Sequence, residues 1–254
     1  MISLKTPQEI AAMRKGGKIL AETVFAITEQ AKPGVSELEL DALAEKLIRE
    51  KGGEPAFQHV PGYHHAICAS TNNVIVHGIP TDYVLKNGDV FGVDCGVIFE
   101  GLQTDMAETI IVGGKAHASA QVIQFLDTGK KALEFAIKQV KPGNRVGHIS
   151  KTIQMIVEDG AGYGVTRELI GHGVGYELHE DPEIPGYLAR PIEKTPLLKE
   201  GMTIAIEVIY NMGSSHIAYK KDGWTIVTED GSLSGLFERT VAVTENGVRI
   251  LTSA

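Results

Sequence analysis

Two stretches of this sequence each end in a carboxylate on an otherwise apolar strand. Residues 85–94 read LKNGDVFGVD and end at Asp94, and residues 198–207 read LKEGMTIAIE and end at Glu207. Each stretch combines a glycine-containing turn with a run of residues that favours a strand. Burying one ionised carboxylate costs several kcal/mol unless it is paired or binds a metal. The repeated pattern therefore predicts that both carboxylates contact a shared cation.

A third carboxylate, Asp105, is expected beside Asp94. If Glu100 and Gly101 are the central turn residues of a hairpin, Gly96 faces Asp105 and Asp94 lies diagonally across the same face. Diagonal neighbours lie roughly 7 to 8 Å apart at the backbone, so both side chains can reach one ion. A shift of one residue in the loop would place the two carboxylates on opposite faces of the sheet.

The second part of the sequence offers His172 within GHGVG, Glu207, and Glu238 within FERTVAV. Taken singly, such residues have structural explanations, because Asp105 could cap a turn, Glu238 could pair with Arg239, and His172 could be a core histidine. Together they make an oxygen-rich set with one imidazole, which suits divalent Mn, Fe, Co or Zn. The predicted metal ligands are Asp94, Asp105, His172, Glu207 and Glu238.

Five protein ligands are many for one ion and favour a pair of divalent ions. Two ions about 3.5 to 4 Å apart can bind one water between them and lower its pKa toward about 7. The chemistry that this predicts is hydrolysis. The glycine string around His172 lacks the spacing of a dinucleotide-binding motif, and we find no phosphate site.

Two further short motifs each occur once in the first half and once in the second half of the sequence. Lys-Pro-Gly occurs at residues 32–34 and 141–143, each time ahead of an amphipathic helix, and a His-Gly-aliphatic triplet occurs at residues 77–79 and 172–174. Two similar halves that face each other would place their strand residues in one central cleft, where small-molecule sites tend to lie. The sequence therefore predicts a pseudo-two-fold duplicated scaffold around the metal.

Capping signals define the first two helices. Thr6 with Pro7 and Glu9, and Ser36 with Glu39, form capping boxes ahead of apolar stripes. Two more helices are expected near residues 116–140 and 146–159. Strands are expected at residues 66–76, 89–98, 104–112, 202–210, 215–220, 224–228 and 237–243. Strands with hairpin connections and helices in separate blocks indicate an α+β fold, with a mainly antiparallel sheet flanked by helices.

Composition narrows the class of protein. The chain has 254 residues, 43% of them hydrophobic, and a formal net charge of −8. We expect one catalytic domain over residues 1–254, with internal halves of roughly 1–112 and 113–254, because no low-complexity linker separates them. Without a Lys/Arg run, DNA and other nucleic acids are excluded as main partners.

The cellular compartment is predicted from the absence of membrane-spanning, secretory and disulfide signals in the sequence. No segment approaches the ~20 apolar residues that cross a bilayer, and the N-terminus shows no secretory cleavage pattern. Cys68 and Cys95 are too few for a disulfide framework. We therefore expect a cytoplasmic protein with no membrane partner, and a monomer.

At this point the sequence resembles the type I methionine aminopeptidases, which belong to the pita-bread metallopeptidases. The likeness covers nearly the whole chain and rests on the order and spacing of several motifs. These are VHGIP at 76–80, VDCG at 93–96, Asp105 with Ala107 and Thr109, GHGVG at 171–175, HEDP at 179–182, Ile206-Glu207, and DGWT at 222–225. The resemblance implies the pita-bread fold and a site of two divalent ions (Co, Mn, Fe, Zn or Ni) on the same five ligands.

The resemblance also implies roles for individual residues. Glu207 would be general base and acid for the attacking water, His179 would stabilise the tetrahedral intermediate, and His77 would contact the substrate backbone. An apolar pocket for the methionine side chain would be lined by Phe57, Tyr63, Cys68, Leu178 and Trp224, with His77 and His179 also contacting substrate.

Three positions depart from the family pattern: Val60-Pro61 replaces a Tyr-His pair, Val208 replaces a proline, and Arg239 replaces a histidine. A nearby imidazole from His59, His64 or His65 is a hypothetical replacement for the missing histidine of the pair. Substrate preference is therefore less firmly implied than metal chemistry.

The implied function is removal of the initiator methionine from nascent polypeptides when the second residue is small. The N-termini of nascent chains would be the partners, with the ribosome as a further candidate. Two alternatives stay open: an Xaa-Pro dipeptidase or aminopeptidase of the same fold, and a non-catalytic pita-bread binding protein. The dipeptidases normally carry an extra N-terminal domain, and a binding protein would be expected to have lost ligands.

Overall fold

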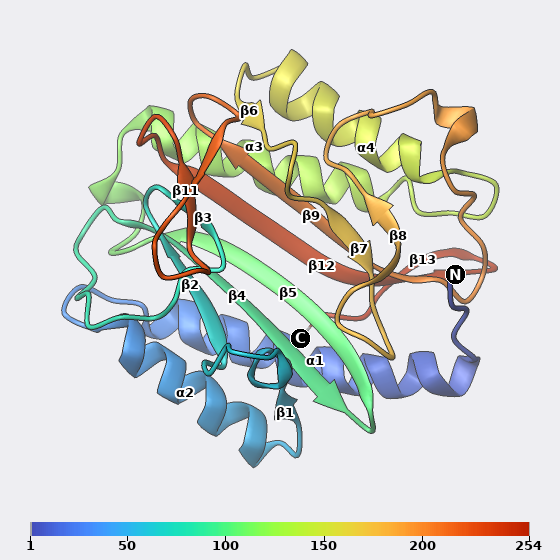
Figure 1. Ribbon diagram of the computed structural model, residues 1–254, viewed down its shortest axis with the longest axis horizontal. Coiled ribbons are helices and arrows are strands. Elements are labelled where there is room, and N and C mark those ends of the chain that lie inside the picture. The colour runs from blue at the N-terminus through green and yellow to red at the C-terminus, as the bar shows by residue number, and fades with distance from the viewer. Residues whose placement is uncertain (1, 254) are drawn as a thin grey trace.

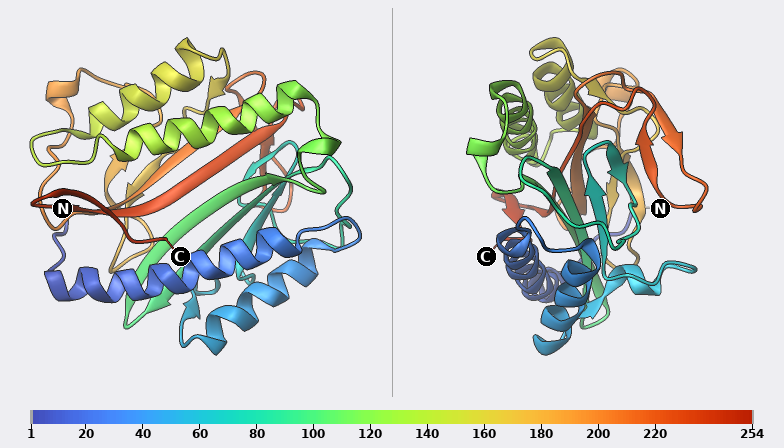
Figure 2. Two further views of the ribbon diagram at one scale, coloured as in Figure 1. Left: turned by 180° about the vertical axis from the view of Figure 1, so that it is seen from behind. Right: turned by 90° about the vertical axis from the view of Figure 1, so that its left-hand side faces the viewer.

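Two pairs of helices cover one face of the central strands in the computed structural model, which describes residues 2–253 (Figure 1). The views from behind and from the side show all four helices on the same face (Figure 2). The helices are α1 (Pro7–Gln30), α2 (Glu37–Glu50), α3 (Ala120–Ile137) and α4 (Val146–Gln154), the last continued by a π-helical turn, Met155–Asp159. Short 3-10 turns lie at Ala56–His59, Lys115–His117 and Ile192–Lys194. None of the described helices is long and apolar enough to cross a membrane.

Both predicted capping boxes are confirmed. The Thr6 backbone N–H donates to the Glu9 carboxylate at 2.7 Å, and the Glu9 N–H donates back to the Thr6 hydroxyl at 3.2 Å. Ser36 and Glu39 repeat the exchange at 2.8 and 3.3 Å. Each box satisfies backbone donors that a helix N-terminus would otherwise leave open.

The first sheet contains the predicted hairpin in the predicted register. It consists of β1 (Glu54–Pro55), β2 (Ile67–Thr71), β4 (Val90–Phe99) and β5 (Leu102–Ile111), all antiparallel. Gly96 pairs with Asp105, so Asp94 lies diagonally across the same face. The turn residues Glu100 and Gly101 have φ of 52° and 76°. Positive φ at both central positions is what a tight two-residue hairpin requires.

The second sheet is larger and holds the other predicted carboxylate strands. It runs in the order β13 (Gly247–Ile250), β12 (Ser234–Thr244), β9 (Thr203–Asn211), β7 (Gly171–Gly173) and β8 (Glu180–Ile184), with β6 (Gly164–Val165) also paired to β9. Glu207 on β9 lies directly opposite Glu238 on β12. Like charges opposite each other destabilise a sheet unless something neutralises them.

One strand prediction is wrong. Residues 66–76 form two strands, β2 and β3 (Val74–Val76), and these belong to different sheets. The chain turns between them at Asn72, which has φ of 59°. β3 pairs instead with β11 (Ile226–Thr228), and β11 pairs with β10 (Ile217–Tyr219). The strands β1, β6, β7, β8 and β13 were not predicted, and the α+β class with mainly antiparallel sheets is confirmed.

Threonine hydroxyls join the two large sheets where β5 runs beside β12. The Thr240 hydroxyl accepts from the Asp105 N–H at 2.9 Å and donates to the Asp105 carbonyl at 2.8 Å. On the other strand, the Thr109 hydroxyl accepts from the Leu236 N–H at 3.0 Å and donates to the Leu236 carbonyl at 2.7 Å. We call this contact the hydroxyl seam. It holds Asp105 and Glu238, from different halves of the chain, next to each other.

Each helix pair covers its own apolar core. Alternation along β9 sends Val208 and Tyr210 toward α3, so Glu207 and Ile209 face the opposite side. The Tyr210 hydroxyl is inserted into α3, where it accepts from the Gly129 N–H at 3.1 Å and donates to the Phe125 carbonyl. A Cβ at Gly129 would lie 2.5 Å from that hydroxyl, so glycine is required there.

Replacing Tyr210 with Phe should lower the free energy of unfolding by about 1–3 kcal/mol, because the Gly129 N–H and Phe125 carbonyl would lose a buried partner. Denaturant titration measures the change. The control is Tyr163→Phe, since the Tyr163 ring contacts Phe125 at 5.1 Å between centroids but its hydroxyl has no hydrogen-bond partner among residues 2–253. Equal losses in the two variants would contradict the role of the inserted hydroxyl.

Candidate metal centre and adjoining pocket

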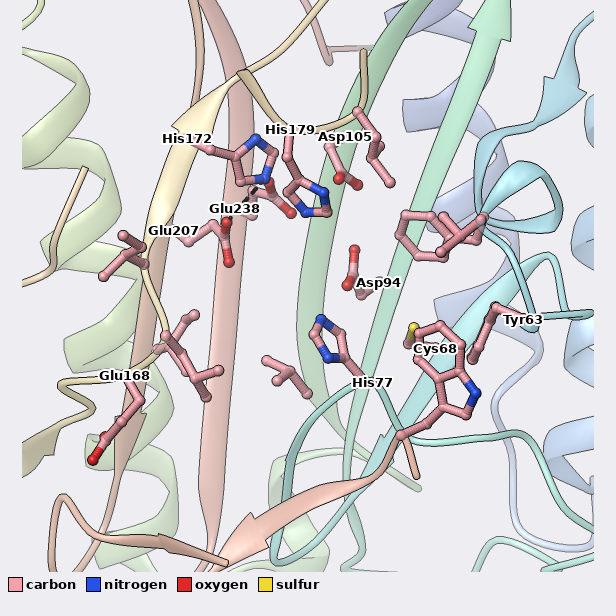
Figure 3. A pocket seen from close by; sticks show the side chains of 18 residues that line it. Tyr63, Cys68, His77, Asp94, Asp105, Glu168, His172, His179, Glu207 and Glu238 are labelled. Atoms are coloured by element: carbon pink, nitrogen blue, oxygen red, sulfur yellow. Dashed lines mark ion pairs between the residues drawn. The ribbon is translucent and has the colours of Figure 1, made fainter. Parts of the chain in front are cut away.

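A cavity of about 260 Å³ opens on the face of the sheets away from the helices, above the hydroxyl seam. It is lined by every residue predicted to be a metal ligand, a catalytic residue or part of the substrate pocket. These are Phe57, Tyr63, Cys68, His77, Asp94, Asp105, His172, Leu178, His179, Glu207, Trp224 and Glu238. Figure 3 shows Asp105, His172, His179, Glu207 and Glu238 gathered at one end and Tyr63 and Cys68 at the other.

Five elements supply the cluster of titratable groups at the polar end. Asp94 and Asp105 come from β4 and β5, Glu207 and Glu238 from β9 and β12, and His172 from the short strand β7. One ligand atom each from Asp105, His172 and Glu238 lies within 4.8 Å of the other two. The His172 Nε2 atom lies 3.3 Å from a Glu207 carboxylate oxygen, as the dashed line in Figure 3 marks.

Burial of these groups is deep. Asp105 is 4% exposed, Glu238 2% and His172 8%. Asp94 and Glu207 retain some exposure, and they line the same cavity. Asp94 Oδ1 and Glu238 Oε1 are buried without a hydrogen-bond partner among the described residues. Unsatisfied buried carboxylate oxygens are costly, and a cation bound between them would satisfy both.

The pKa values of the buried carboxylates indicate a site that favours a bound positive charge. Burial raises the pKa of Asp94 to about 8, and the neighbouring Glu207 carboxylate adds to the effect. Burial, followed by repulsion from the other carboxylates, also raises the pKa of Asp105 and of Glu238 well above the usual range. Protein groups alone do not neutralise this cluster, and the donor set of four carboxylates and one imidazole fits divalent cations.

The pKa values of the three cavity histidines shift in different directions. Burial alone would lower the pKa of His172, but its contact with Glu207 raises that pKa overall. Burial and the neighbouring histidines lower the pKa of His179 to about 4, and burial lowers the pKa of His77. The His172 and His179 rings meet edge to face with centroids 4.3 Å apart. At neutral pH, His77 and His179 are therefore uncharged imidazoles, each able to donate one N–H.

The backbone around His77 is constrained. His77 has φ of 55°, which a side-chain-bearing residue rarely adopts. A Cβ on the following Gly78 would lie 2.0 Å from the Ala69 carbonyl oxygen, so only glycine fits. The strained His77-Gly78 step aims an imidazole into the cavity from outside the sheets, in keeping with strain at functional sites.

The other end of the cavity is apolar and closely packed. The Tyr63 ring contacts Trp224 edge to face at 5.0 Å between centroids and Phe57 at 6.4 Å. The Tyr63 hydroxyl is satisfied by the Ile67 carbonyl at 2.8 Å, so it presents an apolar ring to the space. Cys68 and Leu178 complete the wall. The cavity as a whole therefore places an apolar side-chain pocket beside a polar, cation-accepting centre.

Part of the cavity wall was not predicted from the sequence. Val76, Glu168, Leu169, Ile170 and Ile209 also line it, and most are apolar residues that resemble ordinary core. Figure 3 shows Glu168 at the edge of this group, away from the other carboxylates. The residues 168–170 lead into β7, so their place in the wall depends on how that short strand pairs.

The departures from the family pattern lie mostly away from the cavity. Val208 is buried in the core beneath α3, and the Arg239 guanidinium pairs with Glu108 at 2.7 Å on the opposite side of β12 from Glu238. Val60 does line the cavity. Neither His59, His64 nor His65 is among the lining residues, and His65 bonds Asp41 at 2.7 Å. The structure gives no support to the hypothesis that one of these three replaces a missing imidazole.

Comparison with known proteins identifies relatives over the whole length of the chain. Residues 11–249 match the model of metallopeptidase family M24. The chain is 42% identical over 252 residues to a methionine aminopeptidase of Clostridium perfringens and to methionine aminopeptidase 1 of Bacillus subtilis, covering 99% of each partner and of itself. A solved methionine aminopeptidase from Thermotoga maritima is 40% identical with a TM-score of 0.95 over 100% of both chains. A prolidase from Pyrococcus furiosus is 27% identical with a TM-score of 0.76, over 99% of this chain and 65% of that one.

Removing divalent metal should destabilise the protein most at high pH. Folding raises the pKa of Asp94 from 3.8 to about 8, so without metal this group costs stability increasingly as pH rises through that window. A bound cation favours the ionised form and cancels the cost. Thermal unfolding with and without divalent metal, at about pH 5 and about pH 8, should show a larger metal-induced rise in Tm at the higher pH. A metal effect that shrinks with rising pH would contradict this account.

Proposed function

Because this chain belongs to metallopeptidase family M24, we propose that it removes the N-terminal methionine of polypeptides by hydrolysis, with the N-termini of nascent chains as substrates. The fold is the pita-bread fold that this family shares. The observation that supports the proposal most strongly is the shared cavity, in which an acidic, cation-accepting centre adjoins an apolar pocket. The likeness to methionine aminopeptidases over the full chain agrees with it.

Membership of a metallopeptidase family implies that divalent metal binds to this chain. We infer two ions, because five candidate ligands line one cavity and two buried carboxylate oxygens lack hydrogen-bond partners within residues 2–253. The ligands would be Asp94, Asp105, His172, Glu207 and Glu238. When bound, such ions polarise a carbonyl and make water more acidic.

Glu207 is the proposed general base and acid. Unlike Asp105 and Glu238 it keeps some exposure to the cavity, so a reacting water can approach its carboxylate. It would take a proton from the attacking water and then deliver that proton to the leaving amide nitrogen. Its contact with His172 at 3.3 Å would orient the carboxylate for these transfers.

His179 and His77 are proposed to act as neutral donors. An imidazole N–H of His179 would stabilise the negative oxygen of the tetrahedral intermediate, and burial strengthens such a bond. His77 enters from the other side of the cavity and would hold the peptide backbone of the substrate. The low pKa of His179, about 4, keeps that ring uncharged at the pH of the reaction.

The apolar end would bind the methionine side chain. Methionine is unbranched and polarizable, so it can fill a narrow pocket through dispersion and sulfur–aromatic contacts. Phe57, Tyr63 and Trp224 supply the aromatic edges, while Cys68 and Leu178 supply smaller apolar groups. Since the scissile bond must lie near the metal ligands, a small second residue would fit best beside the crowded carboxylates.

The substrate class can be tested with two tripeptides. Metal-stripped protein should cleave neither Met-Ala-Ser nor Ala-Pro-Ala, and adding divalent metal should restore cleavage of Met-Ala-Ser alone. Release of the N-terminal residue, followed by chromatography, is the measurement. Cleavage of only the proline peptide would favour an Xaa-Pro enzyme, which the likeness to a prolidase fold keeps as a second candidate. No metal-dependent cleavage of either peptide would favour a binding protein.

Replacing His179 with Ala should lower kcat/KM for Met-Ala-Ser by about 100- to 1,000-fold, because one preorganised donor to the oxyanion is lost. Metal content, measured by mass spectrometry, should stay unchanged. His64→Ala is the matched control, since His64 is exposed and does not line the cavity. Equal losses in both variants, or full activity in His179→Ala, would contradict the assigned role.

A further inference from the structure

The turn that joins β7 to β8 carries two cavity residues but has few backbone bonds of its own. Residues 174–179 lie between Gly173 and Glu180, which pair with each other. They bring Leu178 and His179 into the cavity. Within the turn, the Gly175 N–H donates to the Glu177 carbonyl at 3.0 Å. The position of His179 therefore depends on what holds this turn from outside.

Thr203 and Gln103 bond the backbone of Val174 and Gly175 at the start of the turn, and the N-terminal segment holds its later residues through a buried lysine. The Lys5 side chain is 0% exposed, and its ammonium group donates to the Glu180 carboxylate and to the Ser3 hydroxyl. The Ser3 hydroxyl donates to the same carboxylate oxygen of Glu180. The Tyr176 ring covers the ammonium group, with Lys5 Nζ 4.8 Å from the ring centroid.

The other oxygen of Glu180 holds the turn directly. It accepts from the Tyr176 N–H at 2.7 Å and from the Glu177 N–H at 3.1 Å. One carboxylate thus joins the N-terminal segment to the backbone of the turn, and its residue is the immediate neighbour of His179. The Lys5 ammonium is buried and Glu180 is partly buried, so breaking the pair leaves the ammonium without its carboxylate partner, and the two residues act as a unit.

The Lys5 side chain fits closely against the backbone of the turn at Gly175. A Cβ on Gly175 would lie 2.2 Å from Lys5 Cε, so the lysine stem packs against bare backbone. The Lys5 N–H donates to the Gly201 carbonyl at 2.7 Å, which fixes the segment to the turn that precedes β9. The Tyr176 hydroxyl donates to Glu9 on α1 at 2.6 Å and adds a second link. Figure 1 shows the N-terminal end lying at this edge of the molecule, near β8.

We propose that Lys5 is a positioning residue for the proposed peptidase reaction: it holds the turn between β7 and β8, through Glu180, so that His179 stays aimed at the reacting carbonyl. This inference rests on the proposed function. Displacement of a catalytic group by about 1 Å can cost about 100-fold in rate. The Lys5 and Glu180 pair touches neither the metal ligands nor the apolar pocket, so its loss should affect the reaction step and leave metal binding intact.

The test compares Lys5→Met, which keeps the unbranched stem and removes the charge, with the wild type on Met-Ala-Ser. We expect kcat to fall about 10-fold or more, as for a misplaced catalytic group, while KM and metal content stay unchanged. Glu180→Gln, an isosteric change at the other partner, should give the same pattern. In the double variant the loss should not exceed that of the worse single variant, because both changes break one contact.

Two control variants separate positioning from general destabilisation. Tyr210→Phe weakens the opposite side of β9, and Lys51→Met removes a surface ion pair with Glu22 that is 2.6 Å long. Assayed well below their Tm values, both should keep the wild-type kcat.

An unchanged kcat in Lys5→Met or Glu180→Gln would overturn the inference, as would an equal loss in Tyr210→Phe or multiplying losses in the double variant. If Lys5→Met does not fold, Glu180→Gln decides by the same criteria. A wild type that fails to cleave Met-Ala-Ser with added metal would instead overturn the proposed function.

Discussion

Repulsion among buried carboxylates is the constraint on which this structure depends. Asp94, Asp105, Glu207 and Glu238 come from four long strands and converge in one cavity, with Glu207 directly opposite Glu238. Burial raises the pKa values of three of them, and two of their oxygens lack partners among the described residues. Only a rigid frame keeps such groups together, and the two helix-backed sheets provide it. The same repulsion favours the binding of divalent cations in the cavity.

Local chemistry explains what could be predicted from the sequence. The hairpin register follows from a two-residue turn at Glu100 and Gly101, and that register alone places Asp94 and Asp105 on one face. Capping boxes mark where α1 and α2 begin because donor and acceptor lie three residues apart. Each of these signals is contained within a few neighbouring residues. The functional roles of the cavity residues rest on proposals that experiments can now address.

Contacts between distant residues explain what could not be predicted. The turn at Asn72 splits one apolar run between two sheets, because β3 finds its partner in β11, about 150 residues later in the chain. Nothing near Arg239 in the sequence shows that its partner is Glu108 on β5. The short strands β7 and β8 carry too few residues for a periodic pattern, yet they position His172 and His179. Such features depend on packing, which no local window contains.

The hydroxyl seam has the form of a subunit interface. One threonine from each side bonds the backbone of the other, which is the reciprocity found where two copies of a protein meet on a two-fold axis. Because both threonines belong to one chain, Asp105 and Glu238 are brought together without an association step, whatever the protein concentration. The side that carries Asp105 supplies carboxylates to the polar cluster, while the side that carries Glu238 supplies His172 as well as carboxylates.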